Sequence, residues 1–226
     1  LSNEKSDVRF QFDAPEHIRQ EVRQELGKND VKLVQCFARL PDVEHKCRRV
    51  FRFAKDMGIE TIVAEPREAA LDMIEKLCEE YQINLAIHNH PKPSHYWHPD
   101  RVLKACRGRS RRIGACADIG HWVRSGIDPI QAINKLEGRI ISVHLKDVSD
   151  FGDKQAYDVA FGAGKAKIRE TLAELKNQNF TGLFTIECKF AEQADLMAKL
   201  RHSVHYFNRV AYELNQAGPQ YIVAAS

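Results

Sequence analysis

Short apolar runs alternate with longer amphipathic stretches along this chain. The apolar runs are rich in Val, Ile, Leu and Phe and are bounded by turn or cap residues, which is typical of buried strands. They cover Val8–Asp13, Val31–Ala38, Thr61–Glu65, Asn84–His90, Ile113–Asp118, Ile140–Lys146 and Leu183–Lys189. The stretches between them carry helix boundaries, such as Asp128 followed by Pro129, an N-cap and a first helical position. The pattern therefore predicts a repeat of strands and helices.

The period of this repeat is that of β/α units, because the predicted strands recur roughly every 25–30 residues. Apolar strands separated by helices favour a parallel sheet with covered faces, which is either a closed barrel or an open doubly wound sheet. No G-x-G-x-x-G motif follows the first predicted strand, and this weakens a dinucleotide-binding interpretation. A complete barrel has eight strands where seven are predicted here. The first strand would precede Val8, and it is either cut off or absent from this chain.

Five consecutive predicted strands end on residues that can bind a metal ion or move a proton. These residues are Glu65, then His88 and His90, then Asp118, then His144 and Lys146, then Glu187. In a parallel barrel all strands end at one mouth, so we expect these side chains to converge. Side-chain alternation supports this, because Ser142, His144 and Lys146 share one strand face. Two imidazoles and two carboxylates suit one divalent ion such as Mn²⁺, Zn²⁺, Co²⁺ or Mg²⁺.

Composition and charge argue against nucleic acid and membrane as partners and indicate where the protein is located. The 226 residues include 29% charged residues of both signs with a formal net charge of +3, whereas nucleic-acid binders usually carry a basic stripe. No apolar stretch approaches the length of a membrane span. The six cysteines are scattered and are predicted to be reduced. Residues 1–7 show no apolar signal region, so we expect a cytoplasmic location unless a signal was removed before residue 1.

Several blocks of the chain, in this order, resemble the sugar phosphate isomerase/epimerase family, the xylose-isomerase-like barrels. The blocks are Ala86–Pro91, Ala117–Trp122, Ser125–Pro129, Val143–Asp147, Phe161–Gly164 and Thr185–Glu187. The resemblance runs from about Val8 to about Val210, and the D-x-G-H and H-L-K-D blocks are fairly specific to the family. It implies an α/β fold of the (β/α)8 TIM barrel type as a single domain over residues 1–226, and the strand count leaves open whether the first strand is lacking.

The resemblance also implies one divalent metal ion held by Glu, Asp, His and Glu at successive strand ends. The last three positions correspond to Asp118, His144 and Glu187, and the first falls on His88, where many members have Glu. In keto-sugar epimerases of the family that Glu is one of two acid/base carboxylates. We therefore expect different proton chemistry here, with Glu187 as the metal-bound acid/base.

The partner of Glu187 in proton transfer is predicted to be Glu65, His90 or Lys146, and Glu65 is also a candidate for the metal shell. His121 matches the family position that contacts substrate oxygens, and Trp97 lies in a loop predicted to cover the mouth. Simpler structural roles exist for several of these residues. His88 is compatible with a core histidine, Glu65 with a helix cap before Pro66, and Lys146 with an ion pair to Asp147 or Glu187.

These residues favour a divalent-metal-dependent isomerase or epimerase that acts on a sugar, a keto-sugar or a sugar phosphate through proton abstraction and an enediolate. A metal-dependent lyase or dehydratase on a keto-sugar or keto-glycoside, and a non-catalytic sugar-binding barrel, are the alternatives. An endonuclease IV-like nuclease fits less well, because it needs more ligands and a basic groove. The predicted partner is a small sugar, with no nucleic acid and no membrane, and a homo-oligomer is left open.

Overall fold

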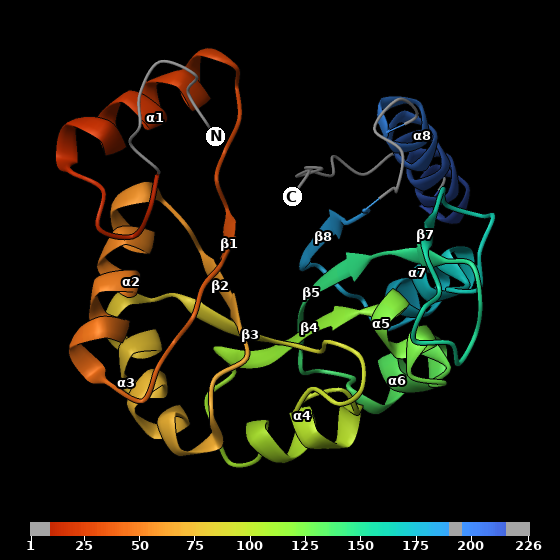
Figure 1. Ribbon diagram of the computed structural model, residues 1–226, viewed down its shortest axis with the longest axis horizontal. Helices are drawn as coiled ribbons and strands as arrows, with labels where there is room; N and C mark the ends of the chain where they lie inside the picture. The colour runs from red at the N-terminus through yellow and green to blue at the C-terminus, as the bar shows by residue number, and fades with distance from the viewer. Residues whose placement is uncertain (1–9, 190–195, 216–226) are drawn as a thin grey trace. The chain divides into compact units, whose positions relative to one another are not determined.

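The structure, a computed structural model, describes residues 10–189 and 196–215 (Figure 1). Its elements fall into two compact units, of which the first ends at Leu85 and the second begins at Ala86. The single domain predicted for the whole chain stays a prediction. Among the described residues, no helix has both the length and the apolar character that crossing a membrane requires.

The first unit contains two parallel strands and the helices that follow them in the chain. Its elements are α1 (Glu16–Lys28), β1 (Gln35–Phe37), α2 (Glu44–Met57), β2 (Thr61–Ala64), the short helix η1 (Glu68–Ala70) and α3 (Leu71–Tyr81). Strand β1 pairs with β2, with Gln35 opposite Thr61. Helix α2 buries an apolar face and ends at Gly58, whose φ of 76° suits a glycine C-cap. Helices α2 and α3 pack against each other.

The second unit carries the remaining strands in the order β3-β4-β5-β8, with β4, β5 and β8 paired in parallel. Strand β3 (Asn84–His88) starts at the end of the first unit and continues into the second. The other elements are α4 (Pro99–Cys106), β4 (Ile113–Asp118), α5 (Ile119–Arg124), α6 (Pro129–Lys135), β5 (Ile140–Leu145), β6 (Asp147–Val148), β7 (Asp158–Val159), α7 (Ile168–Asn177), β8 (Leu183–Ile186) and α8 (Leu196–Asn215). Strands β6 and β7 form a separate antiparallel pair.

Parallel strands that alternate with helices confirm the predicted (β/α) barrel class. In the described part of the chain, six of the seven predicted strands are present, as β1 to β5 and β8. The strand predicted over Val8–Asp13 is wrong for residues 10–13, which contain no strand and turn at residues 12 and 13, while residues 8 and 9 lie outside the described residues. The rings of Phe10 and Phe12 instead pack on Phe53 of α2, at centroid distances of 5.3 and 5.2 Å. No strand precedes α1 in the described residues, which fits a barrel without its first strand.

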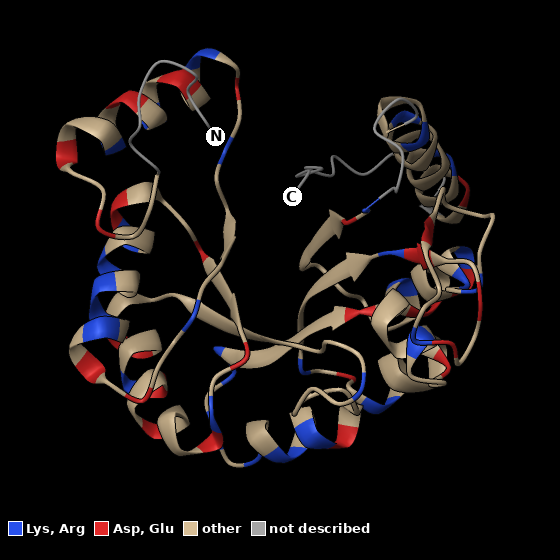
Figure 2. Cartoon of the chain, viewed as in Figure 1, with Lys and Arg blue, Asp and Glu red and all other residues tan. Residues whose placement is uncertain are grey.

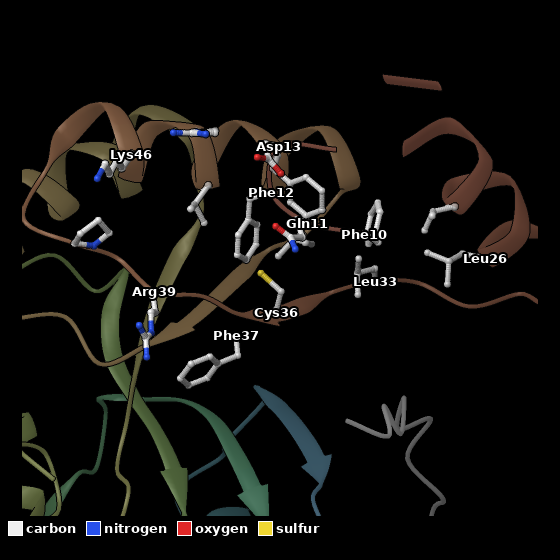
Figure 3. Close-up of a pocket in the computed structure, with 16 residues that line it drawn as sticks. Phe10, Gln11, Phe12, Asp13, Leu26, Leu33, Cys36, Phe37, Arg39 and Lys46 are labelled. Atoms are coloured by element: carbon white, nitrogen blue, oxygen red, sulfur yellow. The ribbon is translucent and has the colours of Figure 1, made fainter. Parts of the chain in front are cut away.

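A cavity of about 780 Å³ lies in the first unit (Figure 3). Its lining is mostly apolar and includes Phe12, Leu26 and Phe53, with the charged side chains of Arg39 and Lys46 also bordering it. None of the predicted site residues lines this cavity. This cavity is therefore not the candidate site for the metal and proton-transfer chemistry that the sequence indicates, although it is large.

The buried carboxylate of Asp147 organises the loop that follows β5. Its Oδ2 accepts hydrogen bonds from the backbone N–H groups of Gly162 (2.9 Å) and Gly164 (3.0 Å). Its Oδ1 accepts from Ala166 (3.0 Å) and from Val148 (3.1 Å). A Cβ on Gly164 would lie 2.3 Å from Oδ1, so only glycine fits there without a shift. Thus one side chain, 2% exposed, satisfies four backbone donors of a connecting segment.

Replacing Asp147 with Asn should lower the free energy of unfolding by on the order of 3 kcal/mol. The amide keeps the shape, but its NH₂ group would face two N–H donors that now share a carboxylate oxygen. Urea unfolding measures the change. Asp153→Asn is the matched control, because this exposed loop carboxylate accepts one hydrogen bond, from Gln155, and should change stability by less than about 0.5 kcal/mol. Equal stability of the two variants would contradict the role given to Asp147.

Candidate functional site

Neighbouring parallel strands of the second unit place polar side chains in register near their C-terminal ends. Asp118 at the end of β4 is in register with His144 of β5, and Cys116 is in register with Ser142. Because side chains alternate along a strand, Cys116 and Asp118 share one face of β4. Figure 2 shows acidic residues at the C-terminal ends of β4 and β8. The strand ends thus gather carboxylates and imidazoles in the second unit.

Four predicted ligands meet at this point. His88, Asp118, His144 and Glu187 each offer one ligand atom, and these atoms lie within 4.8 Å of one another. His88 Nε2 is 3.7 Å from Asp118 Oδ2, and His144 Nδ1 is 2.8 Å from Glu187 Oε2. His88, Asp118 and His144 are at most 8% exposed. Two imidazoles and two carboxylates in such a cluster fit one divalent ion by their donor chemistry. Their assignment as ligands stays a prediction.

The ammonium group of Lys146 lies among the same carboxylates. Its Nζ is 2.7 Å from Glu187 Oε1 and 3.1 Å from Asp118 Oδ2. The side chain is 2% exposed, so its charge depends on these partners for compensation. Of the two ion pairs considered for Lys146 from the sequence, the one with Glu187 is present. The contact with Asp118 is an addition.

The electrostatics of the cluster favour ionised carboxylates. Burial opposes ionisation of Asp118, but His121, Lys146 and His88 outweigh it and hold the pKa of Asp118 well below its usual value. Burial likewise opposes ionisation of Glu187, and His144 and Lys146 overcome it to lower its pKa to about 2. Burial alone would lower the pKa of Lys146, yet Asp118 and Glu187 raise it. Charged carboxylates and a charged ammonium therefore stabilise one another.

Two histidines of the site, His121 and His144, have pKa values shifted in opposite directions. Burial lowers the pKa of His121 to about 3, so this imidazole is neutral near pH 7. Burial would also lower the pKa of His144, but Cys116, Glu187 and Asp118 raise it well above the usual value. Conversely, burial opposes ionisation of the Cys116 thiol, and His144 outweighs it and lowers the pKa of the thiol.

The D-x-G-H block has a clear structural explanation. Asp118 ends β4 and also caps α5, because its Oδ1 accepts a hydrogen bond from the backbone N–H of His121 (2.8 Å). Gly120 lies against Lys146, and a Cβ there would be 2.8 Å from the Lys146 backbone oxygen. The block therefore positions a carboxylate and an imidazole while leaving room for the lysine.

His121 faces two cationic donors. Arg124 lies 3.2 Å from its Nδ1, and Lys146 Nζ lies 3.3 Å from its Nε2. A neutral imidazole has only one acceptor nitrogen, so it accepts a hydrogen bond from one of the two at a time. Arg124 is also paired with Asp158, whose other oxygen accepts a hydrogen bond from the backbone N–H of Lys189 (2.6 Å). This chain of contacts links His121 to the segment that carries Glu187.

Sequence reasoning missed three contributors to this arrangement. Asn89 forms a reciprocal pair with the Asp118 backbone, donating to its O (2.9 Å) and accepting from its N–H (2.8 Å). Arg124 and Asp158 are the other two. Asn89 lies between His88 and His90 in the sequence. Side-chain alternation assigns it to the opposite strand face, so the pattern gave no reason to include it. Arg124 and Asp158 are 34 residues apart, and no sequence pattern pairs them.

Three further residues predicted for the site, His90, Trp97 and Glu65, are not among the four clustered ligands. His90 follows β3 and is exposed, with its ring centroid 4.5 Å from His88 and 5.2 Å from His121. Trp97 is half-buried in its loop, where Lys92 Nζ lies 4.0 Å from the ring centroid. Glu65 directly follows β2 in the first unit. The roles of His90, Glu65 and Trp97 stay predictions.

Comparisons with known proteins agree with this fold. Residues 3–209 match the model of a family described as xylose isomerase-like TIM barrel. No curated protein matches the chain. A solved structure of an uncharacterised protein from Parabacteroides distasonis is 32% identical, with a TM-score of 0.68 over 90% of this chain and 80% of that chain.

Two more distant structures share the fold. A D-tagatose 3-epimerase-like protein is 19% identical, with a TM-score of 0.72 over 89% of this chain and 85% of its own. The IOLI protein, solved with a bound zinc atom, is 16% identical, with a TM-score of 0.71 over 89% of this chain and 84% of its own. At these identities the likeness shows the barrel fold.

Replacing Gly120 with Ala should destabilise the protein by about 1–3 kcal/mol, because the new methyl group overlaps both the side chain and the backbone oxygen of Lys146. Urea unfolding measures this. Gly27→Ala is the control, since the helical Gly27 has open space around its Cβ position and alanine there should be neutral or stabilising. If Gly120→Ala were as stable as the parent protein, the close approach of Lys146 would be wrong.

Proposed function

The chain belongs to the xylose isomerase-like TIM barrel family, and we propose that it is a divalent-metal-dependent isomerase or epimerase acting on a sugar, a keto-sugar or a sugar phosphate. The observation that carries the proposal is the buried cluster of His88, Asp118, His144 and Glu187, with Lys146 beside both carboxylates. The zinc atom in the IOLI structure and the name of the epimerase-like protein support it.

His88, Asp118, His144 and Glu187 would hold the ion, because imidazole and carboxylate are ligands that such ions accept. When bound, a divalent ion supplies a Lewis acid that polarises a carbonyl and favours the enediolate form of a sugar. Both Glu187 oxygens now have partners, Oε1 with Lys146 and Oε2 with His144. We infer that ligand binding frees one of these oxygens for proton transfer.

Glu187 and Lys146 are the proposed proton-transfer pair. Glu187 is ionised at neutral pH and can accept the proton next to a carbonyl, although a carboxylate with a pKa of about 2 is a weak base until a partner is removed. Lys146 carries a proton 2.7 Å away and can donate it to the substrate oxygen. His121, neutral and beside Lys146, is the proposed group that orients a sugar hydroxyl.

The geometry also favours a second candidate, a lyase or dehydratase on a keto-sugar or keto-glycoside. Epimerisation by two bases requires proton-transfer groups on opposite faces of the substrate carbon. Glu187 and Lys146 instead lie side by side, and His88 stands where many family members have the other carboxylate. A neighbouring base and acid suit a proton transfer on one face, as in an aldose–ketose isomerisation. They equally suit removal of a proton followed by loss of a group from the β carbon.

The wild-type protein should contain about one tightly bound divalent ion per chain, and His144→Ala should lose it while remaining folded. His144 is expected to contribute a ligand atom and is not part of an apolar core. Elemental mass spectrometry after incubation with Mn²⁺ or Zn²⁺ measures the content, and circular dichroism checks the fold. His205→Ala, an exposed histidine of α8, is the control. Full occupancy in the His144→Ala protein would contradict the ligand assignment.

The metal-loaded protein should exchange a carbon-bound proton of its substrate with D₂O. We would screen keto-hexoses, hexose phosphates and keto-glycosides by NMR. Glu187→Gln should slow the exchange by about 10²–10⁴-fold because it removes the base, whereas Glu137→Gln, on the surface, should not.

The product of this reaction separates the two candidates. A deuterated isomer identifies an isomerase or epimerase, and an unsaturated product identifies a lyase. Absence of exchange with all three substrate classes in a metal-loaded protein would count against both.

A further inference from the structure

A second group of possible ligands lies next to the carboxylate cluster. Cys116 is two residues before Asp118 on the same face of β4 and is fully buried. Its Sγ and one nitrogen each of His88 and His144 lie within 4.8 Å of one another. The three side chains come from three strands, β3, β4 and β5, so the backbone fixes their spacing. The group contains two imidazoles and a thiol but no carboxylate.

His144 links the two groups. Its Nδ1 faces Glu187 Oε2 at 2.8 Å, so this nitrogen belongs to the carboxylate side. Cys116 Sγ lies within 4.8 Å of a nitrogen of the same ring, and Cys116 is in register with Ser142, one level before His144 in the strand direction. His88 is likewise common to both groups. Two cations so close would repel each other and compete for the same imidazoles.

We propose that His88, Cys116 and His144 form a second, deeper cation site that takes thiophilic ions such as Zn²⁺, Cd²⁺ or Cu⁺, and that an ion bound there displaces the ion of the carboxylate site. Thiolate and imidazole are the ligands that soft and borderline ions prefer, whereas Mn²⁺ and Mg²⁺ prefer carboxylate oxygen. Only the second half of the proposal rests on the proposed function, since the deeper site needs no activity.

Binding at the deeper site exchanges a proton for the metal ion. The S–H bond of Cys116 breaks, the sulfur–metal bond forms, and the thiol proton passes to solvent. The oxidation state of the ion does not change. The simpler explanation is that Cys116 only fills space in the core, as buried cysteines commonly do. This explanation predicts no difference between cations when the thiol is replaced.

The test compares Cd²⁺ with Mn²⁺ on metal-free protein by calorimetric titration. Cys116→Ser should weaken Cd²⁺ binding by at least about 100-fold, while Mn²⁺ binding should change by less than about 3-fold. Cys106→Ser, another buried cysteine of the second unit that lies outside the cluster, should leave both affinities unchanged. Equal Cd²⁺ affinity in the parent protein and the Cys116→Ser protein would overturn the site.

A measurement on the unmodified protein covers the case in which Cys116→Ser fails to fold. Co²⁺ added to the metal-free protein should produce a thiolate-to-metal charge-transfer absorption in the near ultraviolet. Its absence would overturn thiol ligation.

Displacement is tested separately, by adding Cd²⁺ to Mn²⁺-loaded protein and measuring released Mn²⁺. About one Mn²⁺ per chain should leave the parent protein and little should leave the Cys116→Ser protein, whereas equal release would overturn the competition. If Mn²⁺ does not bind at all, the carboxylate site of the proposed function is contradicted for this ion, but the Cd²⁺ and Co²⁺ results still decide the deeper site.

Discussion

The ion pairs of the buried Lys146 with Asp118 and Glu187 are the constraint on which the second unit depends. An uncompensated charge in such a place would be strongly destabilising, so both carboxylates and the ammonium must be positioned together. Asp118 ends β4, Lys146 directly follows β5 and Glu187 directly follows β8, and Gly120 leaves the space that the lysine occupies. The fold therefore brings charges together at the strand ends that no single β/α unit could stabilise alone.

A further layer of hydrogen bonds holds this arrangement in place. Asn89 fixes the backbone of Asp118, and Asp158 binds both Arg124 and the segment after Glu187. Asn89 and Asp158 bind backbone groups and Arg124, and so leave the predicted ligand atoms available. Rigid placement of this kind is what a reaction by proton transfer requires, because a shift of the base by one ångström slows it greatly.

Sequence reasoning found the residues whose position follows from strand alternation. Asp118, His144 and Lys146 end predicted strands, and the structure brings them together. The apolar run Val8–Asp13 also predicted a strand, but the rings of Phe10 and Phe12 pack on Phe53, a tertiary contact that the local pattern does not contain. Long-range pairs such as Arg124 with Asp158 could not be predicted either, because the local pattern contains no information on tertiary contacts. Cys116 could have been found, since it shares its strand face with Asp118.

The charges of the cluster balance among its own side chains. Two carboxylates are matched by the Lys146 ammonium and by His144, whose pKa is raised by its neighbours. An ion that binds the carboxylates also needs an unprotonated His144, so it replaces a proton as well as adding charge. Unlike a small zinc domain, the protein does not need the ion to compensate its acidic residues. We therefore expect Lys146 to be required for the fold as well as for the proposed proton transfer, and the proposed metal for the chemistry alone.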